Sequence, residues 1–121
     1  MIESKKAKFN YDYDTDSYSV IPIKRRYDSS VQIGDFVLDI DEKNNLTGVE
    51  ILNISRILKI SKAFLINQVG GQLEVVVTKD FLKLNLTIRS VVRNSDKTSV
   101  LSVERAKPEF LEPAELNFGV A

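Results

Sequence analysis

The stretch from Asp35 to Ser55 constrains the fold most, because two strand patterns flank a turn signal and a helix start follows. Apolar residues occupy every second position of the first strand: Phe36, Leu38 and Ile40. This period of two is typical of a strand with one buried face. Residues 41–45 carry turn chemistry, since Asn tolerates the left-handed conformation of tight reversals. The segment predicts a β-hairpin with Ile40 and Ile51 in its core, and Gly48 predicts a bulge or a close approach.

Short helices are expected after this hairpin. Asn53 or Ser55 predicts the N-cap of a first helix, and Ser61 predicts the N-cap of a second helix over residues 62–68. One kinked helix is the alternative. Gly70-Gly71 is expected to end the helical region, because glycine is frequent after helix C-termini.

Strand patterns on both sides of these helices set the fold class. Residues 8–24 predict a first hairpin, whose return strand ends at Pro22 or lies at an edge. Residues 72–105 predict a C-terminal β-meander, and its central strand, residues 82–93, carries four apolar residues on one face. The order predicts an α+β fold: an antiparallel sheet of two N-terminal hairpins, one or two short helices, then a C-terminal antiparallel meander packed as one domain.

The expected domain covers residues 1–107 and is followed by a Pro-containing tail, residues 108–121. Pro108 and Pro113 interrupt regular structure there. The tail either docks on the domain through its apolar residues or is mobile. These apolar residues are Phe110, Leu111, Leu116 and Phe118.

The amino-acid composition excludes several kinds of catalytic and metal site. The chain of 121 residues has no Cys and no His, so disulfides, thiolate nucleophiles, serine triads and His-ligated metals are excluded. Seventeen basic and seventeen acidic side chains cancel, which removes the summed positive field of a non-specific nucleic-acid binder. No complete catalytic motif is present. We therefore expect a protein that is not an enzyme, with no cofactor, no metal and no nucleic-acid partner.

Acidic residues of the central hairpin form the first candidate site. Asp39, Asp41 and Glu50 can share one face, and paired carboxylates perform acid–base chemistry when burial separates their pKa values. A solvent-facing polar side of a half-buried sheet explains the same pattern without any chemistry. Strand alternation alone predicts that pattern, so the structural explanation is favoured.

Basic residues form the second candidate site, an anion-binding patch. Lys24, Arg25 and Arg26 follow the first hairpin, and the lysine-rich residues 5–8 open it, so the two groups can meet. The competing explanation is protection of an edge strand by charge, which the zero net charge favours.

A partial calcium-loop pattern occurs in the turn of the first hairpin. Asp12, Asp14 and Asp16 have the alternate spacing of oxygen ligands, but the sixth and twelfth positions are Ser17 and Ile23, where Gly and Glu are required. We expect a solvated turn whose Asp side chains bond the backbone, without tight calcium binding.

Three short motifs occur together in the first half of the chain: Tyr11-Asp12 with Asp16, Asp39 with Asp41, and the run Gly48-Val49-Glu50-Ile51-Leu52 before Ser55. On these residues, the segment from about residue 9 to 58 resembles the domain of unknown function 2283 family, which consists of small uncharacterised prokaryotic proteins. The resemblance implies a fold and an archaeal source for this longer form, and it carries over no catalytic residue. Some members lie beside small toxin-like proteins, which implies an antitoxin-like or partner-binding role.

We expect a self-associating, non-catalytic binding module in the cytoplasm, without a membrane segment. The argument for a homo-oligomer is that several valines lie on the outward faces of their strands, and an apolar second face usually contacts another layer or subunit. These valines are Val76, Val91, Val92 and Val100. The alternatives are an antitoxin-like regulatory partner of a small basic protein and a carboxylate-based hydrolase using Asp39, Asp41 or Glu50.

Overall fold

The computed structural model describes residues 3–24 and 26–120. Its first half contains the strands β1 (Glu3–Asp12), β2 (Ser17–Pro22), β3 (Ser29–Ile33), β4 (Phe36–Ile40) and β5 (Leu46–Ile51). Two short helices follow, α1 (Ile54–Leu58) and α2 (Lys62–Ile66). The second half contains β6 (Gln68–Val77), β7 (Phe81–Val92), β8 (Ser95–Ala106) and β9 (Ala114–Val120).

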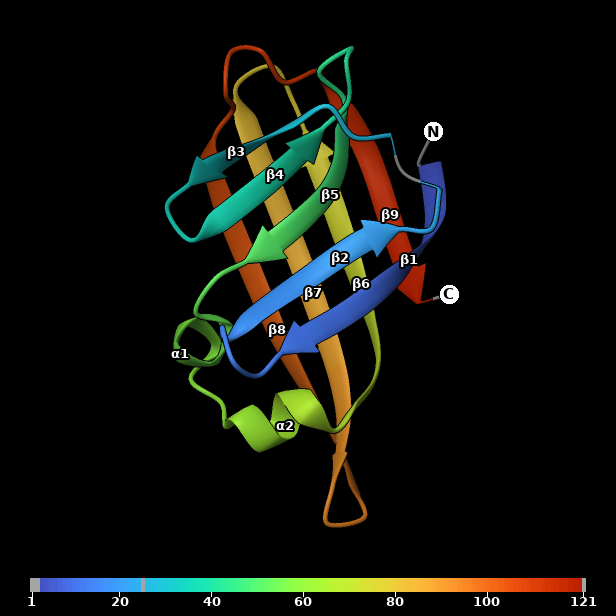
Figure 1. Ribbon diagram of the computed structural model, residues 1–121, viewed down its shortest axis with the longest axis vertical. Helices are drawn as coiled ribbons and strands as arrows, with labels where there is room; N and C mark the ends of the chain where they lie inside the picture. Colours follow the sequence, from blue (N-terminus) through green and yellow to red (C-terminus); the bar gives the residue numbers. More distant parts are fainter. Residues whose placement is uncertain (1–2, 25, 121) are drawn as a thin grey trace.

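All of these strands belong to one sheet, in the order β3-β4-β5-β2-β1-β9-β6-β7-β8. The sheet curls on itself, so that β1 to β5 cross in front of β6, β7 and β8 in Figure 1. The two margins approach each other without joining: the Arg105 guanidinium on β8 lies 5.6 Å from the centre of the Phe36 ring on β4. Both helices lie at one end of the curled sheet (Figure 1).

The alternation in the sequence explains the core. The central hairpin buries Phe36, Leu38 and Ile40 on β4, as predicted, and Ile51 is 1% exposed. In the second half of the chain, every second residue of β7 is buried against these side chains: Leu82, Leu84, Leu86 and Ile88. As predicted, β7 is an interior strand, paired with β6 and β8. The inner faces of both halves therefore form one continuous core.

The predicted purely antiparallel sheet is wrong, because the sheet is mixed. Strand β9 pairs in parallel with β1, from Glu3 opposite Leu116 to Ala7 opposite Val120, and antiparallel with β6. The tail therefore docks: it supplies the strand that joins the two halves of the sheet, and Phe118 is fully buried. The pairing joins residues from opposite ends of the chain, so no local pattern could reveal it.

The helices are close to the predicted pair. The Ser61 side chain accepts a hydrogen bond from the Phe64 amide at 3.2 Å and caps α2, which ends at Ile66. Asn53 precedes α1 in a left-handed conformation and makes no side-chain cap. The prediction that Gly70-Gly71 ends the helical region is wrong, because β6 already begins at Gln68.

Gly71 has a packing role within β6 instead. A Cβ atom there would lie 2.9 Å from the Phe9 ring, so a larger residue would displace that ring. The expected bulge near Gly48 is confirmed. The β4–β5 register shifts between Asp39 and Ile40, and Thr47 is the extra residue on β5.

Candidate functional site

The outward face of the first half carries the candidate site. The strand register places Glu50 of β5 next to Ser19 of β2, and Ser19 next to Asn10 of β1. Val37 of β4 pairs with Glu50, so these four side chains lie in one row across the sheet. Neither helix covers this face in Figure 1. Its side chains are therefore open to a ligand or partner.

Three adjoining hollows mark this face. One of about 280 Å³ lies over β2 to β5, and its lining includes Ser19, Ile21, Asp39 and Glu50. A second, of about 390 Å³, shares Ser19 and Ile21 with it and extends to Lys8. The third, of about 400 Å³, is lined by Lys5, Lys6, Pro22, Ile23 and Lys24, and it shares Pro22 and Ile23 with the second. Neighbouring hollows share residues, and we call the three hollows together the groove.

The end of the groove over β4 and β5 is acidic. Asp39 and Glu50 line the same hollow, as their alternation in the sequence suggested. Ser30 donates a hydrogen bond to Asp39 Oδ1 at 2.7 Å, and the Tyr27 and Ser30 hydroxyl oxygens are 3.0 Å apart. Glu50 is half-buried and has no hydrogen-bond or ion-pair partner among the described residues. Its carboxylate is thus available for a partner molecule.

The opposite end of the groove is basic. Lys24 meets Lys5 and Lys6 in one hollow, so the two basic segments approach each other across the hairpin. Lys6, Lys8 and Lys24 are exposed, and none has an acidic partner within the described residues. Arg25 lies outside the described residues. The groove thus carries opposite charges at its two ends.

Asp41 does not join the groove, although it was grouped with Asp39 and Glu50. Its carboxylate Oδ1 accepts hydrogen bonds from the backbone amides of Asn45 and Lys43, at 3.0 and 2.8 Å, within the β4–β5 turn. These bonds, with the Asn45 amide first, and the charge of Arg26 hold the pKa of Asp41 below its usual range. Asp41 therefore has a local structural function in the turn.

The turn of the first hairpin uses its acids differently from a calcium loop. Asp12 Oδ1 accepts hydrogen bonds from the amides of Asp14 and Thr15, as expected for a solvated turn. Asp16 instead faces α1: it accepts bonds from the Tyr11 hydroxyl and the Ser55 hydroxyl, both at 2.7 Å, and from the Ser55 amide at 3.3 Å. We call Tyr11, Asp16 and Ser55 the clasp.

Electrostatics support a structural function for the clasp. Burial alone would raise the pKa of Asp16, but the hydrogen bonds from Ser55 and Tyr11, with the charge of Lys62, hold it below its ordinary value. Burial, the hydrogen bond to Asp16 and nearby negative charge raise the pKa of Tyr11. The Lys62 Nζ atom also lies 4.7 Å from the centre of the Tyr13 ring. The clasp therefore connects the hairpin turn to both helices.

A second buried connection was not foreseen from the sequence. The Tyr18 hydroxyl donates to the Gln68 side chain, whose Nε2 atom donates to the Phe9 carbonyl at 3.0 Å. Burial raises the pKa of Tyr18, so the hydroxyl stays protonated and able to donate. This contact joins β2 to the start of β6 and so links the two halves.

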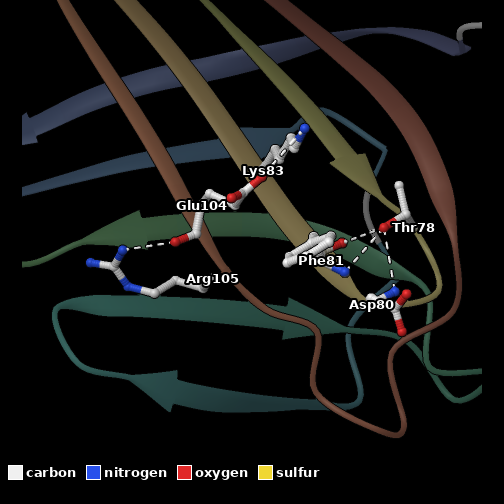
Figure 2. Close-up of polar contacts among 6 residues, drawn as sticks. All are labelled: Thr78, Asp80, Phe81, Lys83, Glu104 and Arg105. Carbon is white, nitrogen blue, oxygen red and sulfur yellow. Dashed lines mark hydrogen bonds and ion pairs between the residues drawn. The ribbon is translucent and has the colours of Figure 1, made fainter.

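The outward face of β6 to β9, which we call the far face, has several polar side chains paired across neighbouring strands. Figure 2 shows Lys83 of β7 beside Glu104 of β8, with a nitrogen–oxygen distance of 3.3 Å. Nearby, Ser102 donates to Asn85 at 2.5 Å and Gln72 donates to Asn117 at 2.9 Å. These pairs link neighbouring strands and stabilise the sheet.

Two features of the far face bear on self-association. Val100 is 60% exposed, as predicted, whereas Val92 packs partly buried against the core, so its assignment to the outward face is wrong. The reason is the period of two: Val92 shares a face with Ile88 and Ser90. A hollow of about 360 Å³ at Gly70-Gly71 has Arg89 as the charged residue in its lining.

Within residues 3–24 and 26–120, no group of three acidic side chains is placed to hold a metal ion. In the same part of the chain, no helix is long and apolar enough to cross a membrane. The described geometry thus presents a sheet face with separated charges and neighbouring apolar residues.

Comparison with known proteins confirms the family resemblance. Residues 8–55 match the family described as protein of unknown function (DUF2283). This segment runs from β1 into α1 and contains the clasp, Asp39 and Glu50. Tyr11, Asp16 and Ser55 are all among the residues that carry the family resemblance, so the sequence singled them out. The sequence could not show that these three side chains contact one another.

Two archaeal proteins resemble a larger part of the chain. An uncharacterized protein of Methanocaldococcus jannaschii is 28% identical over 92 residues, which cover 75% of this chain and 79% of that protein. A protein of Methanosarcina mazei, named a putative hypoxanthine phosphoribosyltransferase, is 27% identical over 92 residues, which cover 76% of this chain and 75% of that protein. No solved structure matches.

Proposed function

We propose that this protein is a non-catalytic, self-associating interaction module that binds through the groove. The observation that carries the proposal is a separation of charges that have no partner among the described residues: Glu50 lies at one end and Lys8 and Lys24 lie toward the other, with apolar residues between them. Charges that neighbouring side chains do not neutralise remain available for a partner, where they guide orientation and specificity. A cytoplasmic location and the absence of a nucleic-acid partner stay predictions.

The apolar part of the groove supports binding rather than mere solvation. Ile23 is 64% exposed and Tyr27 53% exposed, and both line hollows of the groove. Burying such side chains in an interface stabilises it by about 25 cal/mol per Å² of apolar surface removed from water. Exposed apolar residues with a charged rim are the usual composition of an interaction surface.

Sedimentation of the full chain across low to high micromolar concentrations tests self-association. We expect the average mass to rise with concentration beyond that of one chain. A strict monomer at the highest concentration would overturn the self-associating part of the proposal.

A carboxylate-based hydrolase is the second candidate, because Asp39 and Glu50 line one hollow. A screen with generic phosphodiester and ester substrates, with and without magnesium, tests it. We expect no turnover above background. If an activity is found, an unchanged rate in Asp39→Asn and Glu50→Gln would exclude this site as its source.

The antitoxin-like alternative comes from the family resemblance and the charged groove. A small basic protein would bind the acidic end beside Asp39 and Glu50. Mass spectrometry of the untagged protein purified from its own cells tests this alternative. A stoichiometric small basic partner that Glu50→Lys releases would favour it over self-association.

The name of the Methanosarcina relative supplies one defined small molecule to test. Calorimetric titration of this protein with hypoxanthine is expected to give no saturable heat, since the proposed surface binds a protein. A saturable heat that Glu50→Gln removes would replace the interaction module with a small-molecule site in the groove.

A further inference from the structure

We propose that the groove binds the groove of a second copy of this chain, related by a two-fold axis that lies in the interface, parallel to the sheet. The axis passes over β2 between Ser19 and Ile21, at right angles to the line that joins Lys8 to Glu50, and Lys8 of each copy faces Glu50 of the other. This proposal rests on the interaction module proposed above and specifies its partner and contact residues.

The position of the axis follows from charges across the sheet. Glu50 and Lys8 lie on opposite sides of β2, which separates β5 from β1. With strands about 4.8 Å apart and about 3.3 Å per residue, they are about 12 Å apart, too far for a direct ion pair within one chain. A two-fold axis that lies in the interface, through the midpoint between them and at right angles to the line that joins them, places each over its opposite charge in the second copy.

Apolar residues lie close to the proposed axis. Ile21 is half-buried and Ile23 is exposed, and both line the middle of the groove. Five strands give a face about 20 Å wide, and β1 is about 33 Å long, whereas β2 to β5 are about 17–20 Å long. The face is therefore smaller than the roughly 800 Å² that each partner contributes to a standard interface.

Edge pairing through β8 is a weaker way to form a dimer. An antiparallel β8–β8 pair centred on Val100 would place Asp96 opposite Glu104 of the second copy. Centring the pair on Leu101 would place Lys97 opposite Arg105 of the second copy. Both registers bring like charges together, which disfavours them. The charges on β8 therefore protect this edge, whereas the charges in the groove favour association.

Charge reversal of the full chain tests the proposal by sedimentation velocity. Lys8→Glu and Glu50→Lys should each weaken the dimer at least about tenfold, because each places like charges together at both symmetry-related contacts. The double variant restores opposite charges and should dimerise like the original chain. An equimolar mixture of the two single variants should form a heterodimer, since every contact in it is again complementary.

Lys83→Glu on the far face is the matched control, because it makes the same charge change beside Glu104. We expect it to leave the dimer unchanged. Lys8→Gln and Glu50→Gln, which remove charge without reversing it, should weaken the dimer less than the reversals. Circular dichroism melts verify that every variant is folded, and the heterodimer rescue supplies a result that misfolding cannot produce.

Two results would overturn the proposal, and they differ in their meaning. If the chain associates but neither reversal weakens it, another surface forms the contact, while the self-associating module remains. If the original chain is monomeric at the highest concentration, the proposed self-association fails together with this interface. A double variant and a mixture that both stay monomeric would also contradict the Lys8–Glu50 contact.

Discussion

Both outward faces of the curled sheet come from strands that alternate inward apolar and outward polar residues. The two faces differ in whether outward charged side chains pair with their neighbours. On the far face, Lys83 meets Glu104 and Gln72 meets Asn117 across neighbouring strands. On the groove face, Glu50 and Lys8 lie about two strands apart, without partners among the described residues. Period-two patterning thus sets which residues face outward, while the register decides whether their charges pair within the chain.

The inner faces show no such difference, since both contribute to one core. Strand β9 makes this possible because it lies between β1 and β6. A chain ending at Pro113 lacks β9 and should lose cooperative unfolding, because the sheet is then divided into two parts with exposed edges. Circular dichroism melts measure this, and a sharp transition near that of the full chain would show that the halves need no common strand.

Equivalent truncations in the two halves test the shared core. Ile51→Ala in the first half and Leu86→Ala in the second both remove side chains that are 1% exposed. Each should lower the free energy of unfolding by about 2–5 kcal/mol through lost transfer energy and a cavity. Denaturant titration should give one shifted transition for both variants. Two separate transitions, with only one shifted, would show that the halves unfold independently.

The clasp tests whether the family motif has a structural function. Asp16→Asn should cost about 1.5–3 kcal/mol near neutral pH, the range for hydrogen bonds to a charged group. Asp14→Asn is the matched control in the same turn and should change stability by less than about 0.5 kcal/mol. Equal effects of the two substitutions would contradict a special function for Asp16.

The pH dependence of the same variant has a definite sign. The pKa of Asp16 is lower in the folded chain than its ordinary value, so the ionised clasp stabilises the fold above that value. The stabilisation is lost as pH falls through the folded pKa. The difference between Asp16→Asn and the original chain should therefore shrink below about pH 4. A difference that grows in acid would show that the protonated form makes the contacts.

Thr47 supplies the smallest stability effect. It is the extra residue of the bulge beside the acidic end of the groove, and its hydroxyl is buried without a partner among the described residues. Thr47→Val keeps the shape and removes this group, so it should stabilise the fold by about 1 kcal/mol. Thr98→Val, at an exposed position, is the control and should change stability less.

Local patterns in the sequence predicted much of the fold. The alternation around Phe36 and Leu84 identified β4 and β7, and Ser61 identified the start of α2, because these signals depend on neighbouring residues. The parallel β1–β9 pair could not be predicted, since it depends on contact between the two ends of the chain. The turn between β7 and β8 has Arg93 and Asn94 in left-handed conformations, so the strand predicted over residues 82–93 ends one residue earlier, at Val92.

The candidate site was predictable to a similar extent. Alternation suggested that Asp39 and Glu50 share a face, and hairpin connectivity suggested that Lys24 lies near residues 5–8. The sequence could not show that the acidic and basic groups are the ends of one groove, because the order β4-β5-β2-β1 depends on long-range pairing. Their function in binding stays a prediction.

A matched pair of substitutions tests most directly whether the groove, and not the far face, is the contact surface. Ile23 in the groove is 64% exposed and Val100 on the far face is 60% exposed, so Lys at either position should be tolerated by the fold. In sedimentation velocity at high micromolar concentration, we expect Ile23→Lys to shift the chain toward the monomer and Val100→Lys to leave the assembly intact. An assembly that Val100→Lys dissociates and Ile23→Lys does not would contradict the account and assign association to the far face.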